Sequence, residues 1–171
     1  ARLALNPFVV GYAIDATPPS IALAGVPVGC TSSDVTPTVV VTDAHPEMVA
    51  MTLDGSPFPD GTPVAAEGTH TVAVVAVDAA GNTAESQATF TIDKTLPVIQ
   101  ISGVEEGRVY ASAVAPAATF DDVNLTSSAF LVDGVPFGGG DFVDAEGPHV
   151  LYATATDCAG NIASTTVSFA I

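Results

Sequence analysis

Aspartates are the residues of this sequence with the clearest capacity for chemistry. Asp78 opens the stretch "DAAGN", and Asp157 opens the nearly identical stretch "DCAGN". The chain of 171 residues carries 19 acidic side chains against 3 Lys and Arg, for a formal net charge of −16. Carboxylate oxygens are the ligands that Ca²⁺ prefers in proteins. Calcium is therefore the cofactor that these residues favour.

The same composition excludes several classes of function. Binding to nucleic acid needs a basic surface, which 3 Lys and Arg cannot supply, and no apolar run approaches the ~20 residues of a membrane-spanning helix. Neither a nucleic acid nor membrane insertion is expected. No nucleophile motif surrounds any Ser, His or Asp, so the sequence predicts a protein that is not an enzyme and has no catalytic residue. An acidic, Lys-poor chain that is 48% hydrophobic suggests a folded, secreted protein, extracellular or at the cell surface.

The chain is an internal repeat. "IDATPPSIALAGV" at 14–26 matches "IDKTLPVIQISGV" at 92–104 with an offset of 78 residues. "LDGSPF" at 53–58 matches "VDGVPF" at 132–137 with an offset of 79. Fixed-period similarity over most of a chain indicates copies of one structural unit. We therefore predict two domains, at 15–92 and 93–171, preceded by an extended segment at 1–14.

The sequence pattern of each copy predicts an all-β fold. Apolar, β-branched runs such as "TVAVVAVD" at 71–78 and "VLYATATD" at 150–157 end at turn residues. Pro and Gly interrupt such runs about every ten residues, which is the spacing of a β-sandwich. His70 and His149 occupy the same position in the two copies, which favours a structural role at the corner that enters these strands.

The combination of D-x-T-x-P-x-I ("DKTLPVI", 93–99) with D-x-A-G-N resembles the bacterial immunoglobulin-like repeats of extracellular adhesins and surface proteins. The resemblance covers both copies. It implies an all-β fold of two tandem Ig-like Greek-key β-sandwiches in a rod, with seven strands in each sandwich. It also implies calcium at the junctions between domains.

In such a sandwich the strand direction alternates, so acidic residues distant in sequence meet at one pole of each domain. A cation between carboxylates would offset their mutual repulsion. The predicted metal ligands are Asp15, Asp43 and Asp78 in the first domain, and Asp93, Asp157 and either Asp121 or Asp122 in the second.

A purely structural interpretation of D-x-A-G-N stays open beside the calcium interpretation. Asp at the first position of a turn and Gly with positive φ are ordinary turn chemistry. The turn residues in question are Gly81, Asn82, Gly160 and Asn161.

Two cysteines allow at most one disulfide. Cys30 follows the first predicted strand of copy one, and Cys158 lies in the D-x-A-G-N turn of copy two. Neither has a cysteine at the equivalent position of the other copy, so a bond would join the two domains. In an oxidising compartment this bond is expected, and the alternative is two free, buried thiols.

The segment 1–14 lies outside the two copies of the repeat. "FVVGYAID" at 8–15 resembles the end of the last strand of copy one, "ATFTID". It is either the remnant of a preceding domain or a donor strand that augments a sheet of another subunit. Fourteen extended residues reach up to ~46 Å at ~3.3 Å each.

The function predicted from the sequence is that of a structural or adhesion protein, as a rod-like spacer or a fibre subunit. Its partners would be other copies of itself or neighbouring Ig-like domains stacked head to tail, and a cell-surface receptor. The alternatives are a ligand- or carbohydrate-binding module of a secreted protein, an accessory domain of a secreted enzyme, and a subunit that polymerises by N-terminal strand addition.

Overall fold

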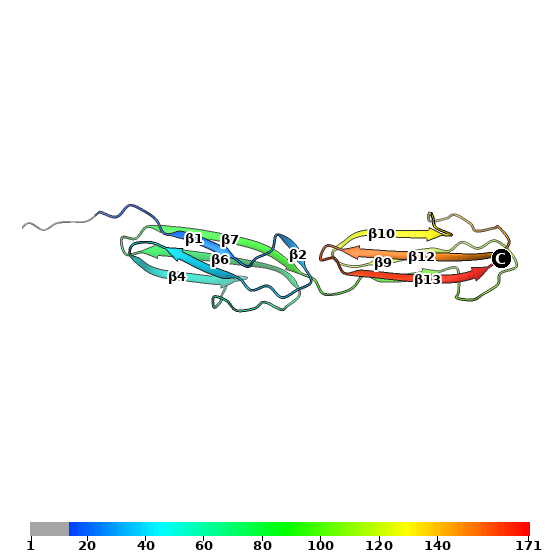
Figure 1. Ribbon diagram of the computed structural model, residues 1–171, viewed down its shortest axis with the longest axis horizontal. Coiled ribbons are helices and arrows are strands. Elements are labelled where there is room, and N and C mark those ends of the chain that lie inside the picture. Colours follow the sequence, from blue (N-terminus) through cyan, green and yellow to red (C-terminus); the bar gives the residue numbers. More distant parts are fainter. Residues whose placement is uncertain (1–13) are drawn as a thin grey trace, which may run out of the picture. The chain divides into compact units, whose positions relative to one another are not determined.

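The computed structural model describes residues 14–171, and these contain strands, turns and no helix (Figure 1). The predicted donor segment therefore lies, apart from Ile14, outside the described residues. No helix among residues 14–171 is long and apolar enough to cross a membrane.

The first repeat contains two sheets. One pairs β1 with β3, and the other has the strand order β2-β7-β6-β4-β5. The strands are β1 (Ser20–Ala24), β2 (Gly29–Thr31), β3 (Thr38–Thr42), β4 (Pro46–Leu53), β5 (Ser56–Pro57), β6 (Gly68–Asp78) and β7 (Thr83–Ile92).

The second repeat has the same plan. One sheet pairs β8 with β9, and the other has the order β11-β10-β12-β13. The strands are β8 (Val98–Ser102), β9 (Ala117–Asp121), β10 (Leu125–Val132), β11 (Val135–Pro136), β12 (Pro148–Asp157) and β13 (Ile162–Ala170). The chain changes sheet between β9 and β10, and β8 contacts β12 and β13 across the two layers. This arrangement confirms the all-β, Ig-like sandwich, with six strands among the described residues of the second repeat instead of the seven that the resemblance implies.

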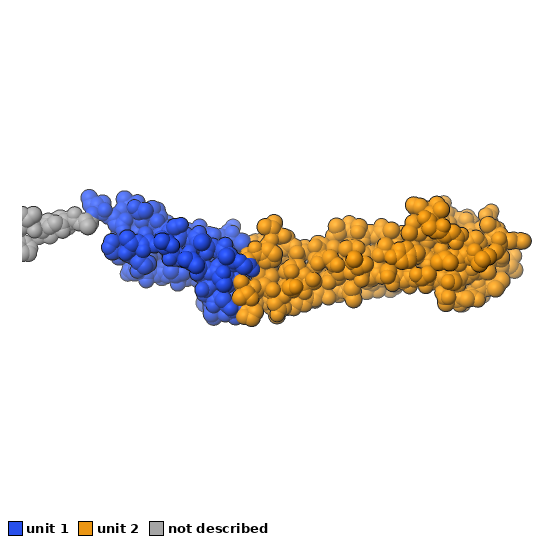
Figure 2. Space-filling view, viewed as in Figure 1, with its two compact units in different colours: residues 1–25, 37–62, 71–88 blue, residues 26–36, 63–70, 89–171 orange. Residues whose placement is uncertain are grey.

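By its packing the chain divides into two compact units (Figure 2). Unit 1 takes the described part of 1–25 together with 37–62 and 71–88, and unit 2 takes 26–36, 63–70 and 89–171. The division runs through the first repeat, so it does not test the domain boundary at 92/93 that the repeat predicts. That boundary, and a rod-like arrangement of the repeats, stay predictions.

Strict alternation along β12 builds the core of the second repeat. Leu151, Ala153 and Ala155 are buried, whereas Val150 before them and Tyr152 between them are exposed. Successive side chains of a strand point to opposite faces of its sheet, so this alternation gives one apolar face. The core comprises Val104, Val114, Val132, Val143, Leu151, Ala153 and Phe169.

Two tight hairpin turns fix the register of the short strands β5 and β11. Asp54 and Gly55 have φ of 51° and 79°, and Asp133 and Gly134 have φ of 54° and 78°. Positive φ at both central residues is the type I′ geometry, for which Asp-Gly is a preferred sequence. The repeated "DG" of the sequence thus has a direct structural cause.

Leu151→Ala should lower the free energy of unfolding by about 2–5 kcal/mol, because it leaves a cavity in a packed core. Val150→Ala, on the exposed face of the same strand, is the matched control and should cost less than about 1 kcal/mol. Chemical denaturation followed by circular dichroism measures both. Equal losses for the two variants would contradict the assigned core face.

Candidate functional site

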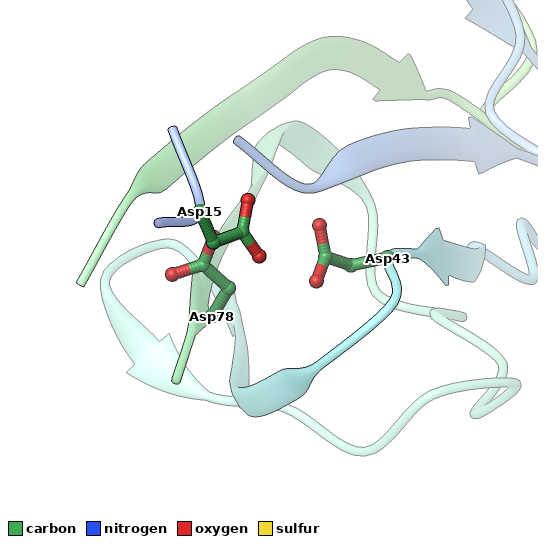
Figure 3. A group of neighbouring side chains, drawn as sticks. All are labelled: Asp15, Asp43 and Asp78. Carbon is green, nitrogen blue, oxygen red and sulfur yellow. The ribbon is translucent and has the colours of Figure 1, made fainter. Parts of the chain in front are cut away.

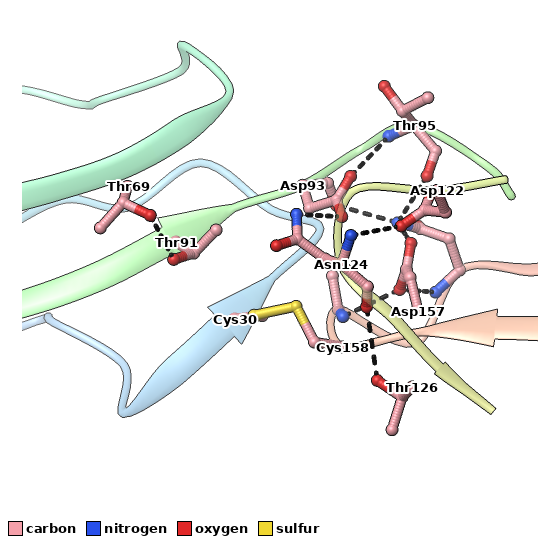
Figure 4. Close-up of a disulfide and its surroundings, with 12 residues drawn as sticks. Cys30, Thr69, Thr91, Asp93, Thr95, Asp122, Asn124, Thr126, Asp157 and Cys158 are labelled. Atoms are coloured by element: carbon pink, nitrogen blue, oxygen red, sulfur yellow. Dashed lines mark hydrogen bonds between the residues drawn. A yellow bond between two sulfur atoms is a disulfide. The ribbon is translucent and has the colours of Figure 1, made fainter.

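The second acidic cluster lies at the start of the second repeat, within unit 2 (Figure 4). Asp93, Asp122 and Asp157 each offer a carboxylate oxygen, and these atoms all lie within 4.8 Å of one another. The structure thus selects Asp122 from the two predicted alternatives. Asp121, the last residue of β9, is exposed and is not part of the cluster.

The first acidic cluster repeats this arrangement within unit 1 (Figure 3). Asp15, Asp43 and Asp78 bring their carboxylate oxygens within the same 4.8 Å, as the sequence predicts. His45 lies at the edge of this acidic cluster, with its Nδ1 3.6 Å from Oδ2 of Asp15. Its counterpart in the second repeat is Asn124, so the two clusters differ in the residue beside them.

The D-x-A-G-N stretch holds its aspartate by local hydrogen bonds. Oδ1 of Asp157 accepts the amides of Ala159 (2.8 Å) and Asn161 (2.9 Å), and Oδ2 accepts Nδ2 of Asn161 (2.6 Å). Gly160 supplies the turn with a φ of 85°. Asp157 is buried, so these donors replace the water that its carboxylate loses.

Asp78 is held in the same way by the first copy of the stretch. Its carboxylate accepts the amides of Ala80 and Asn82, both at 2.9 Å, and Nδ2 of Asn82 at 2.7 Å. The hydrogen bond from the Asn82 side chain is the main cause that lowers the pKa of Asp78 below its usual value. Gly81 has a φ of 88°. Gly81 and Asn82 thus shape the turn and hold the Asp78 carboxylate, and the calcium role of the aspartates stays a prediction.

The donor set of each cluster fits calcium. Ca²⁺ binds oxygen at about 2.3–2.6 Å, so two ligands on opposite sides of the ion lie up to about 5 Å apart, which accommodates the 4.8 Å spread of these carboxylates. Oδ1 of Asp122 accepts the amide of Asn124 (2.7 Å). A crevice of about 410 Å³, lined in part by Asp93, Asp122 and Glu67, opens beside the second cluster.

Asp93, the first residue of the second repeat, is bonded through backbone and side chain. Its amide donates to the carbonyl of Thr31 (2.9 Å), and its carbonyl accepts Nδ2 of Asn161 (2.9 Å). Its carboxylate accepts Nδ2 of Asn124 (2.8 Å). Asp93, in the segment 93–95 that links the two repeats, is therefore hydrogen-bonded to β2 of the first repeat and to two loops of the second.

The next two residues complete this attachment through Glu67. The amide of Lys94 donates to Oε1 of Glu67 (2.6 Å), and the hydroxyl of Thr95 donates to the same carboxylate at 3.0 Å. Nζ of Lys94 donates to Oδ1 of Asp34 (2.7 Å) and to the carbonyl of Ala65 (2.8 Å). Glu67, Lys94 and Asn124 are not among the residues predicted from the sequence, although "EGTH" at 67–70 recurs as "EGPH" at 146–149.

The predicted disulfide between Cys30 and Cys158 is confirmed (Figure 4). The two Cα atoms lie 5.6 Å apart, and the bond spans 128 residues of sequence. Cys30 lies in β2, and Cys158 lies in the turn between β12 and β13, with its amide donating to the carbonyl of Asn124 (2.9 Å). Both cysteines belong to unit 2, and the bond joins the two sequence repeats covalently.

The repeated histidines have the structural role that the sequence predicts. Nε2 of His149 lies 2.8 Å from the carbonyl of Ala145, and its Nδ1 lies 2.7 Å from Oδ2 of Asp133. In the first repeat, Nε2 of His70 lies 3.0 Å from the carbonyl of Ala66. Both partners of His149 are oxygens, and an ionised carboxylate only accepts, so the positively charged form of the ring can donate to both of them. The hydrogen bond to Asp133 is the main cause that raises the pKa of His149.

No family model and no curated protein matches this sequence. Among solved structures, the chain is similar to fibronectin(III)-like modules of Clostridium thermocellum CbhA, with 17% identity, 89% of this chain and 94% of that chain covered, and a TM-score of 0.41. It is also similar to the titin domains Z1Z2 in complex with telethonin, with 16% identity, 92% and 98% covered, and a TM-score of 0.38.

A third similar structure is the Bacteroides ovatus SGBP-B of a mixed-linkage glucan utilization locus, in complex with a heptasaccharide. The identity is 14%, 91% of this chain and 48% of that chain are covered, and the TM-score is 0.39. These scores support no argument about function, and the fold assignment rests on the strand order. Fold and site together define a class: Ig-like β-sandwich repeats joined by one disulfide.

Stability should depend on pH through the pair of His149 and Asp133. The pKa of His149 is raised above 6.5. The contribution of His149 to the free energy of unfolding is therefore fully present below pH 6.5, and it is lost as the pH rises through the folded-state pKa. The pKa of Asp133 is lowered below 3.8, mainly by the hydrogen bond to His149, so its contribution is lost as the pH falls through that lower value.

Denaturant unfolding from pH 5 to pH 9 measures the alkaline arm, with an expected fall in the free energy of unfolding. His149→Gln should flatten this arm, and Asp133→Asn should flatten it too, because each variant removes one member of the pair. An unchanged slope in both variants would contradict the charged-pair assignment.

Removing the disulfide by Cys30→Ser with Cys158→Ser should lower the free energy of unfolding by about 2–5 kcal/mol. Chemical denaturation of this double variant and of the native protein measures the difference. Reduction of the native protein should cause the same loss of unfolding free energy. A denaturation midpoint that neither the double substitution nor reduction alters would contradict a stabilising role of the disulfide.

Proposed function

We propose that this chain is a non-enzymatic structural segment of an extracellular or cell-surface protein, a spacer or adhesion element of the kind found among bacterial Ig-like repeats. The observation that carries the proposal is the attachment of residues 93–95. Backbone and side-chain hydrogen bonds from both repeats converge on Asp93, and the Cys30–Cys158 bond closes the same region. A spacer needs a fixed junction, whereas a binding module needs only its ligand site.

The disulfide supports a location outside the cytoplasm, because such bonds persist in oxidising compartments. The net charge of −16 favours a surface that is soluble and repels other acidic surfaces. Neighbouring Ig-like domains stacked head to tail, and a receptor at the cell surface, are the partners that this role implies.

Calcium is the cofactor that we propose for the two acidic clusters. Each cluster gathers three carboxylates, whose repulsion a divalent cation would offset. In the second cluster Asp93 belongs to the linking segment, so an ion bound there would hold that segment to the loops of Asp122 and Asp157. The chain's own turns already position Asp78 and Asp157, so an ion would bind to ligands that are largely pre-formed.

Electron microscopy of the purified native protein tests the structural role. The proposal predicts uniform elongated particles or fibres in which neighbouring repeats keep one spacing. Compact particles, or repeats that take many relative orientations, would contradict a spacer.

Asp122→Asn and the adjacent Asp121→Asn form a matched pair that tests the metal site. Millimolar Ca²⁺ should raise the melting temperature of the native protein and of Asp121→Asn, because a ligand that binds only the folded state stabilises it. The shift should be smaller in Asp122→Asn, which loses one carboxylate of the second cluster. Differential scanning calorimetry with Ca²⁺ and with a chelator measures these shifts. No shift in the native protein would contradict the calcium role.

A further inference from the structure

β13 is an outer strand of the larger sheet in the second repeat. The sheet has the order β11-β10-β12-β13, so β13 pairs with β12 on one side only (Figure 1). The hydroxyl of Thr154 in β12 donates to the carbonyl of Ala163 (3.1 Å), which places the backbone groups of Ala163 on the paired side. Because backbone groups alternate in direction along an antiparallel strand, the N–H and C=O groups of Ile162, Ser164 and Thr166 point to the outer side.

The chain covers the end of this outer edge and leaves its beginning open. At the end of β13, the carbonyl of Ser168 accepts the amide of Gly107 (2.7 Å), and the amide of Ser168 donates to Oε2 of Glu106 (2.8 Å). Along 162–166, no strand within residues 14–171 pairs with the outer side. Unpaired backbone groups in a row are a template for another strand, so 162–166 form an open edge.

The open edge lacks the features by which proteins block the pairing of strand edges. Residues 162–166 read "IASTT", with no charged residue and no proline. β13 pairs with β12 in unbroken register from Ile162 to Ala170, so no bulge bends the edge away. Charged residues, proline and bulges are the usual means of preventing edge-to-edge pairing. The edge is therefore able to accept a further strand.

The first repeat differs at the centre of the equivalent edge. With the offset of 79 residues, Ser164 corresponds to Glu85 in β7. Like charges directly opposite each other on two strands are destabilising. Two β7 strands that paired about this position would bring two Glu85 carboxylates together, whereas two β13 strands would bring together two uncharged serines.

We propose that β13 of a second copy of this chain pairs antiparallel with β13 along residues 162–166. A two-fold axis at Ser164 places Ser164 opposite its own copy and Ile162 opposite Thr166, so outward-pointing backbone groups meet each other. Each such pair exchanges two hydrogen bonds, and the three pairs supply about six. The larger sheets of the two copies then form one continuous sheet.

The charge of the chain favours this edge as the contact between copies. Two copies with a net charge of −16 repel each other, and approach costs least where neither surface is acidic. Paired residues of neighbouring strands point to the same face of a sheet, and the face beside the open edge has no charged residue. Its three rows are Ser127, Thr156 and Ile162; Ala129, Thr154 and Ser164; and Leu131, Tyr152 and Thr166.

The inference goes beyond the proposed function, because this contact joins copies edge to edge and not head to tail. The pairing uses neither the acidic clusters nor the disulfide. A variant that loses self-association should therefore keep the calcium response of the native protein, which separates the two proposals. Five residues on each side form a contact smaller than a standard interface, so the expected association is weak.

Ser164→Glu and Ala129→Glu are a matched test of the edge. Both residues are exposed and lie in one row of the same face, but Ala129 is in β10, two strands from the edge. Sedimentation velocity of the full chain from about 10 µM to about 1 mM should show a monomer–dimer equilibrium. Ser164→Glu should weaken the dimer at least about fivefold, and Ala129→Glu should leave it within about twofold. Circular dichroism verifies that both variants fold.

Hydrogen exchange of single amides, measured by NMR on the full chain, locates the contact. The amides of Ser164 and Thr166 should exchange more slowly at the higher protein concentration, whereas the amide of Thr165 faces β12 and should be protected at both concentrations. Three results would overturn the proposal: a full chain that stays monomeric, a dimer that Ser164→Glu weakens no more than Ala129→Glu, or exchange at Ser164 and Thr166 that does not depend on concentration.

Discussion

A buried carboxylate at the end of a long strand is the constraint on which the rest of this structure depends. Asp78 ends β6 and Asp157 ends β12, and both are buried. An ionised group that leaves water needs donors in compensation, and the D-x-A-G-N turn supplies two amides and one side-chain amide to each. The need for these donors determines the conformation of the D-x-A-G-N turn. The turn in turn holds the aspartate in place within the acidic cluster of its repeat.

The cluster in turn determines where the linking segment lies. Asn161 uses one Nδ2 group to hold both Asp157 and the carbonyl of Asp93, so the aspartate turn and the start of the second repeat form one hydrogen-bonded system. Cys158, next to Asp157, adds a covalent bond to β2 of the first repeat. The residue that differs between the two copies of the stretch, Ala79 against Cys158, is therefore the residue that joins the repeats.

Much of this was predictable from sequence because it depends on local chemistry. Strands, turns and the two clusters follow from alternation, Asp-Gly turns and the repeat itself. The choice of Asp122 over Asp121 required the end of β9 to be known to one residue, which alternation of a short strand does not fix. The roles of Glu67 and Lys94 depend on loops that approach from distant parts of the sequence.

We propose that the bonds around Asp93 and the disulfide hold the two repeats at a fixed junction. Backbone ¹⁵N relaxation measures it most directly, because it reports the rotational diffusion of each repeat separately. The account predicts that one anisotropic diffusion tensor describes both repeats in the native protein. Two independent tensors, with each repeat tumbling at the rate of an isolated sandwich, would contradict it.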